Sequence, residues 1–411
     1  MNTPKIRFKG FADDWEQRKL GDIADVTKLA GFEFTEHVVY SDEGNIIALR
    51  GLNIKNGQLI LDDVKYIDGS NFSKLSRSKL FIDDIMFTYV GTVGEVAIIK
   101  ENDRFYLAPN VSRIRVKSDD SPKFISHYMR TDNFKNKVIF PLIATSSQPA
   151  LSMENIRKFT INIPISREEQ DCLAKYFDSL NHLITLHQRK CDETKQLKKF
   201  MLQKMFPKNG EKNPEIRFEG FTDDWEQCKL GDVCSRVQGN DGRMELPTLT
   251  ISAGNGWMRQ EDRFSGNIAG KEQKNYTLLR KGELSYNHGN SKLAKYGTVF
   301  SLQTYEEALV PRVYHSFKVK EGNCDFVEYY FATKLPDREL SKLISSGARM
   351  DGLLNIGYDE FMGIQMKFPS TLEQRKISLY FRKLDHLITL HQRKCEKLKE
   401  LKKFMLQNMF V

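Results

Sequence analysis

The sequence predicts an α+β fold: two mixed, strand-rich domains with pseudo-two-fold symmetry, joined by two long helices that form an antiparallel coiled coil. Three observations predict this fold. The sequence segments at the start and end of the first half of the chain recur in the second half. Each half ends with a long stretch of helical periodicity. The segments between the repeats alternate short apolar runs with turn residues, as strands and turns do.

The repeat sets the order of the elements. Residues 4–22 return with few changes as residues 214–232. Between the borders the halves diverge, although residues 156–164 and 361–369 share a period-two apolar pattern that ends in proline, typical of a strand. We therefore expect two domains of one fold with different surfaces. The unchanged repeats are residues 182–191 with 386–395, and residues 197–203 with 401–407.

The domain boundaries follow from the repeats. Residues 207–214 contain two prolines, a glycine and polar residues, so we interpret them as a linker. The predicted parts are a first domain at residues 1–165, a first long helix at 166–206, a second domain at 215–369 and a second long helix at 370–411.

Within the diverged segments, short strands are prominent. Residues 84–99 contain strand-like runs broken by Gly91 and Gly94, and residues 296–302 show a similar pattern. Short helices are expected near residues 122–131 and 325–334.

The long helices carry apolar or small residues at alternating steps of three and four, a 3.5-residue seam typical of a coiled coil. Each helix could instead pack only on its own domain, but about 40 residues at ~1.5 Å each exceed one domain face. We therefore expect the helices to pair. A metal site in the seam is a second alternative, and we favour small polarisable side chains with no metal. The seam residues are Leu180, Ile184, His187, Cys191, Leu384, Ile388, His391 and Cys395.

The composition favours some classes of protein and excludes others. Lysine and arginine (63) exceed aspartate and glutamate (54), which favours a polyanionic partner such as nucleic acid without requiring one. None of the six cysteines forms a Cys-x-x-Cys pair, so zinc ribbons and fingers are not expected. No apolar run reaches the ~18 residues of a membrane span, and no apolar signal region follows Met1. We expect a cytoplasmic protein with free thiols.

Motifs for catalysis are scarce. There is no Pro-Pro pair for the loop with which adenine methyltransferases hold a flipped base, and no glycine-rich loop for S-adenosylmethionine or a nucleotide. Asp262, Glu272 and Lys274 match the loose pattern of metal-dependent nucleases, but in one half only. We expect a chain that is not an enzyme and binds no cofactor of its own.

The order of these features resembles the specificity subunit of type I restriction–modification enzymes over essentially the whole chain. The resemblance rests on the Trp-Glu-x-x-Lys-Leu-Gly-Asp segments that begin at Trp15 and Trp225, and on Gly91-Thr-Val-Gly94. It also rests on the strand–proline–Glu-Gln sequences at residues 164–170 and 369–374, each of which leads into a leucine-rich helix.

The resemblance implies that each strand-rich domain is a target-recognition domain for one half of a bipartite sequence in double-stranded DNA. The long helices would be the conserved spacer. The implied partners are two methyltransferase subunits, which bind S-adenosylmethionine, and motor and nuclease subunits, which use ATP and Mg²⁺. Two alternatives are the recognition part of a self-sufficient type II restriction–methylation enzyme, and a scaffold that binds proteins.

Polar loop clusters in the diverged segments are the candidate DNA contacts, because Arg, Asn, Gln, Ser and Thr recognise base edges and Lys or Arg bind phosphates. The alternative is an ordinary solvated loop. Residues 287–292 and 345–349 are favoured, since they combine glycine with several hydrogen-bonding side chains. Trp15 and Trp225 are expected in the cores. The candidates are Arg50, Asn53, Lys55, Thr92, Asn110, Arg113, Ser146, Ser147, Gln148, Arg259, Arg263, Asn287, His288, Asn290, Ser291, Lys292, Arg312, Ser345, Ser346 and Arg349.

Overall fold

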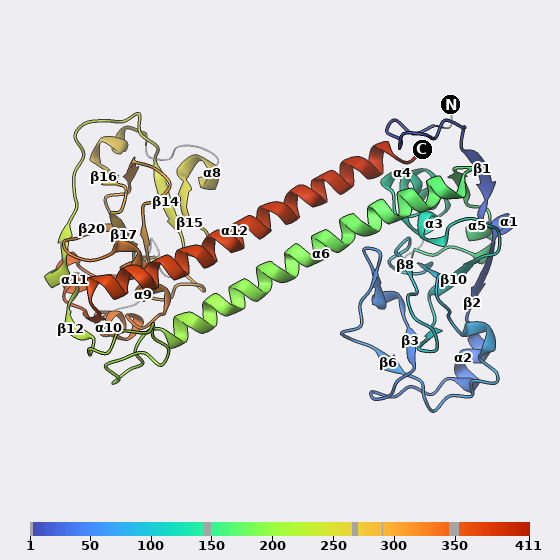
Figure 1. The fold of residues 1–411 in the computed structure, drawn as a ribbon, viewed down its shortest axis with the longest axis horizontal. Coiled ribbons are helices and arrows are strands. Elements are labelled where there is room, and N and C mark those ends of the chain that lie inside the picture. Colours follow the sequence, from blue (N-terminus) through green and yellow to red (C-terminus); the bar gives the residue numbers. More distant parts are fainter. Residues whose placement is uncertain (1–2, 144–148, 265–269, 290, 345–352) are drawn as a thin grey trace. The chain divides into compact units, whose positions relative to one another are not determined.

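The chain folds into two compact units. The computed structural model describes residues 3–143, 149–264, 270–289, 291–344 and 353–411 (Figure 1). Among the described residues, no helix combines the length and the apolar character needed to cross a membrane. We call the two units the first unit, Met1–Gln188 with Arg393–Val411, and the second unit, Arg189–Gln392.

The first unit is built on a four-stranded sheet of order β2-β10-β7-β8, beside the pair β1-β11 and the small sheets β6-β3-β9 and β4-β5. Its strands are β1 (Glu16–Lys19), β2 (Ala24–Lys28), β3 (Ile47–Leu49), β4 (Ile54–Lys55), β5 (Gln58–Leu59), β6 (Lys65–Tyr66), β7 (Ile85–Thr88), β8 (Val96–Ile98), β9 (Phe105–Leu107), β10 (Val111–Val116) and β11 (Thr160–Ile163). Its helices are α1 (Leu20–Ile23), α2 (Gly31–His37), α3 (Pro122–Tyr128), α4 (Asp132–Phe134), α5 (Met153–Arg157) and the first part of α6 (Arg167–Lys204).

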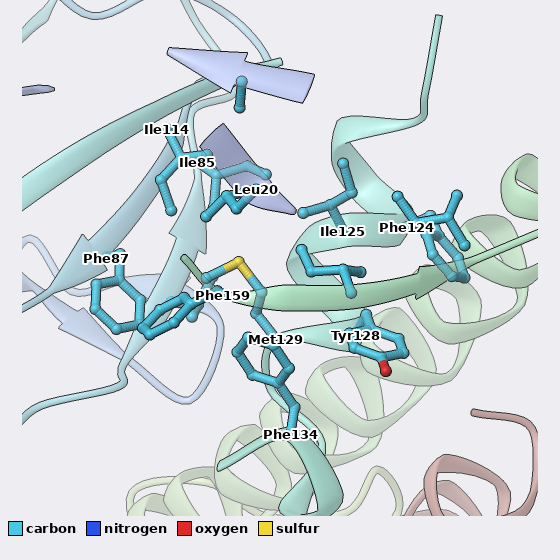
Figure 2. Packing of buried hydrophobic residues seen from close by; sticks show 14 of the residues in the cluster. Leu20, Ile85, Phe87, Ile114, Phe124, Ile125, Tyr128, Met129, Phe134 and Phe159 are labelled. Atoms are coloured by element: carbon cyan, nitrogen blue, oxygen red, sulfur yellow. The ribbon is translucent and has the colours of Figure 1, made fainter. Parts of the chain in front are cut away.

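The core of the first unit forms where this sheet meets α3. Ile85, Phe87 and Ile114 from the sheet are fully buried with Phe124 of α3 and Phe159 (Figure 2). Removing such side chains from water contributes about 1.5–3 kcal/mol each. The predicted break after β7 is a turn in which Gly91 (φ +78°) and Gly94 (φ +92°) adopt the left-handed conformation that glycine tolerates.

The second unit repeats this plan. Its four-stranded sheet has the order β13-β20-β17-β18, and the pair β12-β21 corresponds to β1-β11. The pairs β14-β15 and β16-β19 stand in place of the small sheets β6-β3-β9 and β4-β5 of the first unit. Its strands are β12 (Glu226–Lys229), β13 (Cys234–Arg236), β14 (Leu249–Ser252), β15 (Gly256–Arg259), β16 (Thr277–Arg280), β17 (Leu284–Asn287), β18 (Thr298–Ser301), β19 (Glu307–Val310), β20 (His315–Val319) and β21 (Gln365–Phe368). Its helices are α7 (Leu230–Val233), α8 (Gln260–Phe264), α9 (Cys324–Ala332), α10 (Asp337–Lys342), α11 (Tyr358–Met362) and the first part of α12 (Thr371–Asn408).

The long helices α6 and α12 pair antiparallel within each unit. In the first unit the Cys395 thiol lies 3.9 Å from the carbonyl oxygen of Ile184, and in the second unit the Cys191 thiol lies 3.9 Å from that of Ile388. These are the same contact under the repeat, and both cysteines are buried. Together with the strand-rich units, this confirms the predicted fold class.

The end of each long helix completes a core. Phe410, which follows α12, lies 5.6 Å from Phe124 and 6.3 Å from Trp15 between ring centres. Phe206, which follows α6, lies 5.6 Å from Phe326 and 6.0 Å from Trp225. Both tryptophans are buried, so their expected place in the cores is confirmed.

Candidate nucleic-acid interface

The two four-stranded sheets each border a hollow at the same edge. β7 and β10 are antiparallel with Thr88 opposite Val111, so the end of β7 and the start of β10 lie together. In the second unit β17 ends and β20 begins at the equivalent edge, with Tyr286 opposite His315. Residues that follow β7 and β17, and that precede β10 and β20, therefore line equivalent hollows.

The first-unit hollow has a volume of about 420 Å³. Three of the predicted contacts, Arg50, Thr92 and Asn110, line it together. Asn110 has φ +71°, a conformation that Asn tolerates better than most residues, and its side chain is exposed. The residues that line this hollow are Tyr40, Arg50, Gly51, Leu52, Thr88, Val90, Gly91, Thr92, Pro109 and Asn110.

The second-unit hollow is larger, about 930 Å³, and more cationic. Arg236, Lys274 and Arg312 line it from three separate segments. The Arg236 guanidinium lies 4.3 Å from the centre of the Tyr358 ring, an arrangement that fixes its direction. The other lining residues are Val237, Gln238, Gly239, Asn240, Asn275, Thr277, His288, Val313, Tyr314, His315, Ser316, Leu353, Ile356 and Gly357.

Neutral hydrogen-bonding groups accompany these cations. Burial raises the pKa of Tyr40 and raises the pKa of Tyr358 to about 12, so both phenols keep their protons at neutral pH. Burial lowers the pKa of His315, which therefore stays a neutral imidazole. Each hollow thus offers a protonated phenol beside arginine, which suits base edges and phosphates. Nε2 of His315 already faces the carbonyl oxygen of Ile356 at 2.8 Å.

Three of the residues predicted to contact DNA are instead buried and bonded within their own unit. Asn53 is completely buried, and its amide donates to the carbonyl oxygens of Ile60 (2.9 Å) and Asp63 (2.7 Å). Arg113 is buried and pairs with Asp25 at 2.5 Å. Both ring nitrogens of the buried His288 face carbonyl oxygens, at 2.7 and 2.9 Å. We leave these three out of the proposed contact set, because they are buried and most of their polar atoms have partners. Arg50 stays in the set although it pairs with Asp63 at 2.8 Å, because it lines the hollow.

Other predicted contacts lie away from the linings of the two hollows. Lys55 is exposed on β4, Arg259 pairs with Glu261 at 2.9 Å, and Arg263 donates to the carbonyl oxygen of Ile251 at 2.8 Å. In the favoured run after β17, Asn287 accepts from the amide of Gly289, Ser291 accepts from the amide of Ala294, and Lys292 is exposed.

Several predicted contacts fall outside the described residues: Ser146, Ser147, Gln148, Asn290, Ser345, Ser346 and Arg349. The described residues that follow two of these runs bind at the hollows. The amide of Gly91 donates to the carbonyl oxygen of Pro149 (2.9 Å), and the amide of Leu354 donates to that of His288 (2.8 Å).

Arg236 was not among the predicted contacts, and Lys274 was predicted only within the nuclease-like pattern. Lys274 lines the second-unit hollow, while the carboxylate of Glu272 accepts from the Asn275 amide at 2.7 Å. Within the described part of the chain, no group of three His, Cys, Asp or Glu side chains is arranged to hold a metal ion.

Comparison with known proteins shows which family the chain resembles. Residues 12–196 match the family model of the type I restriction modification DNA specificity domain. The resemblance to type I specificity subunits is confirmed. The matched specificity domain contains all the residues that line the first-unit hollow.

Two curated relatives come from Methanocaldococcus jannaschii. The putative type I restriction enzyme MjaX specificity subunit is 24% identical over 243 residues, which cover 56% of this chain and 55% of the relative. The type I restriction enzyme MjaVIII specificity subunit is 22% identical over 192 residues, or 46% of this chain and 44% of the relative. The chain spans about half the length of these relatives.

A solved structure extends the likeness of fold to the whole chain. The S subunit of the type I restriction–modification system from M. genitalium has a TM-score of 0.62 and 13% sequence identity. The match covers 100% of this chain and 99% of that chain, so the likeness of fold extends over both units.

Proposed function

We propose that this chain is the non-catalytic, sequence-specific DNA-binding subunit of a type I restriction–modification complex. Each unit recognises one half of a bipartite target, and partner subunits then methylate adenines or restrict the DNA. The observation that carries the proposal is the pair of hollows at equivalent sheet edges, lined by different side chains. Two hollows at equivalent positions but with different lining residues suit two DNA half-sites of different sequence.

The linings support distinct half-sites. Arginine can bind guanine through two hydrogen bonds in the major groove, and Asn can bind adenine in the same way. The first-unit hollow offers Arg50 and Asn110, whereas the second offers Arg236, Arg312 and Lys274. Because these sets differ in number and type, the preferred bases differ between the units.

Repeated apolar residues on the long helices support two copies of one partner. In the first unit Leu183, Leu401 and Phe404 are exposed, and in the second unit their repeat counterparts Leu387, Leu197 and Phe200 are exposed. Exposed apolar groups of this kind are typical of protein interfaces. We assign them to two methyltransferase subunits, which bring S-adenosylmethionine; ATP and Mg²⁺ belong to the motor and nuclease subunits.

A domain exchange tests the proposal. The amide of Leu20 donates to the carbonyl oxygen of Phe159, and the amide of Leu230 donates to that of Ile364 in the same way, so these contacts define matched splice points. Residues 230–364 are replaced with residues 20–159, and methylated adenines are mapped across the genome with the partner subunits present. We expect a symmetric motif made of two inverted copies of the first half-site.

The reciprocal exchange, residues 20–159 replaced with residues 230–364, is the matched control and should give inverted copies of the second half-site. A variant that still methylates the original asymmetric motif would contradict the proposal, because the exchanged residues would then not determine the sequence.

A further inference from the structure

An exposed aliphatic side chain lines each of the two sheet-edge hollows. Leu52 belongs to the lining of the first-unit hollow and is 54% exposed. Val313 belongs to the lining of the second-unit hollow and is 53% exposed. A single exposed aliphatic residue is ordinary on a protein surface. These two are distinguished by their place, because each stands among the polar side chains proposed to contact DNA.

The short turn Gly51–Asn53 holds Leu52 in position. The backbone amide of Arg50 donates to the side-chain oxygen of Asn53 at 3.0 Å, and the Arg50 guanidinium pairs with Asp63 at 2.8 Å. Of the four described residues 50–53, Leu52 alone is exposed. The most exposed side chain that this turn offers to the hollow is therefore aliphatic.

A second turn holds Val313. The amide of Tyr314 donates to the carbonyl oxygen of Pro311 at 3.0 Å, and the buried Tyr314 hydroxyl lies 2.9 Å from the Thr250 hydroxyl. The carbonyl oxygen of Val313 faces Nε2 of His288 at 2.9 Å. Because these bonds fix the backbone while Tyr314 occupies the buried place, the Val313 side chain stays at the surface.

Val313 has the place in the second unit that Asn110 has in the first. Tyr89 and His288 are equivalent, because both carbonyl oxygens accept from a leucine amide at 2.8 Å. Asn110 lies before β10 and accepts from the Tyr89 amide at 3.1 Å, while Val313 lies before β20 and faces His288. The second unit therefore has apolar surface where the first unit has a hydrogen-bonding amide.

Thymine has a group that matches such a side chain. Each base pair shows a distinct set of groups in the major groove, and thymine contributes a C5 methyl group to that set. When an aliphatic side chain covers this methyl group, apolar surface leaves water on both partners. The other three bases present hydrogen-bond donors and acceptors there. A fixed leucine or valine can thus distinguish thymine from them.

We propose that Leu52 and Val313 each contact the C5 methyl group of a thymine in the half-site of their own unit. This inference rests on the proposed function, because it requires both hollows to bind DNA, and it adds the group on the base that these two residues recognise. An apolar side chain of a partner subunit would cover the same residues without any dependence on thymine, so the experiment must vary the methyl group alone.

The experiment replaces each thymine of the methylated motif with deoxyuridine, one position at a time, which removes only the methyl group. The affinity of the chain with its methyltransferase partners is measured for each duplex, against a random duplex with the same substitution. We expect at least one position in each half-site at which uracil weakens binding about fourfold, as the loss of one buried methyl group would.

Variants assign each position to a residue. Leu52→Ala should abolish the preference for thymine over uracil in the first half-site and keep it in the second, and Val313→Ala should do the reverse, so each variant is the control for the other. Leu52→Met and Val313→Ile keep an apolar side chain and should keep the preference. Val39→Ala is a further control, because Val39 is 57% exposed outside both linings.

The proposal is overturned if no uracil substitution weakens binding, or if the alanine variants keep the wild-type preference for thymine. Neither result alters the outcome of the domain exchange, so failure here leaves the proposed function intact. An exchange that leaves the methylated motif unchanged would instead contradict the proposed function itself, whatever the uracil duplexes show.

Discussion

At the scale of single residues, exposed arginines at the hollows differ from arginines that hold the fold. Arg312 is exposed and lines the second-unit hollow, whereas Arg113 is buried in an ion pair with Asp25. Residues of the first kind should change DNA affinity, and residues of the second kind should change stability.

Arg312→Ala should therefore weaken specific DNA binding. Loss of a two-bond base contact costs about 1–3 kcal/mol, while loss of a phosphate contact lowers the salt slope by about one. Titration of cognate and random duplexes at several salt concentrations separates the two cases. Arg259→Ala is the control, because Arg259 pairs with Glu261 away from the lining. An unchanged affinity and slope would remove Arg312 from the interface.

A partly buried ion pair should contribute to the stability of the second unit. Arg217 donates to both carboxylate oxygens of Glu373 at 2.8 Å, and Glu373 is only 1% exposed. Glu373→Gln leaves a partly buried guanidinium without its counter-charge, so we expect a loss of about 1–3 kcal/mol in the free energy of unfolding. Denaturant unfolding measures it. The exposed pair Lys281–Glu306 is the control, and Glu306→Gln should cost less than about 1 kcal/mol.

At the scale of elements, the sequence predicts those helices and strands that leave a periodic or repeated pattern of residues. The long helices follow from the 3.5-residue seam, and α3 and α9 lie where short helices were expected. The lining of the second-unit hollow could not be predicted, because strand pairing brings Arg236, Lys274 and Arg312 together from distant segments. Asn53 has the appearance of a loop residue in the sequence, yet tertiary packing uses its whole amide.

The helices should also set the spacing of the two half-sites. We insert four residues after Gln188 and four after Gln392, the boundaries of the units, so that both helices lengthen equally. Four residues add ~6 Å of helix, and DNA advances by about 3.4 Å per base pair. We expect the non-specific spacer of the methylated motif to lengthen by one or two base pairs with both half-sites unchanged. A methylating variant with the original spacer would show that the helices do not set this distance.

At the scale of the whole molecule, the two units differ in how the chain supplies them. The second unit uses one uninterrupted stretch, Arg189–Gln392, whereas the first joins Met1–Gln188 to Arg393–Val411. Met409 and Phe410 belong to the buried core of the first unit, around Trp15. The first unit therefore needs residues that are more than half a chain away in sequence.

This discontinuity reverses the order of folding during synthesis. At about 5–20 residues per second, a ribosome releases the last piece of the first unit roughly 10–45 s after its main part. We expect nascent chains that expose residues 1–392 outside the ribosome to protect the second unit from protease while the first unit is still cleaved. Extension to Val411 should then protect both units. Earlier protection of the first unit would contradict this order. If the order holds, the first unit waits for residues 393–411 to be translated, and depends on chaperones until they arrive.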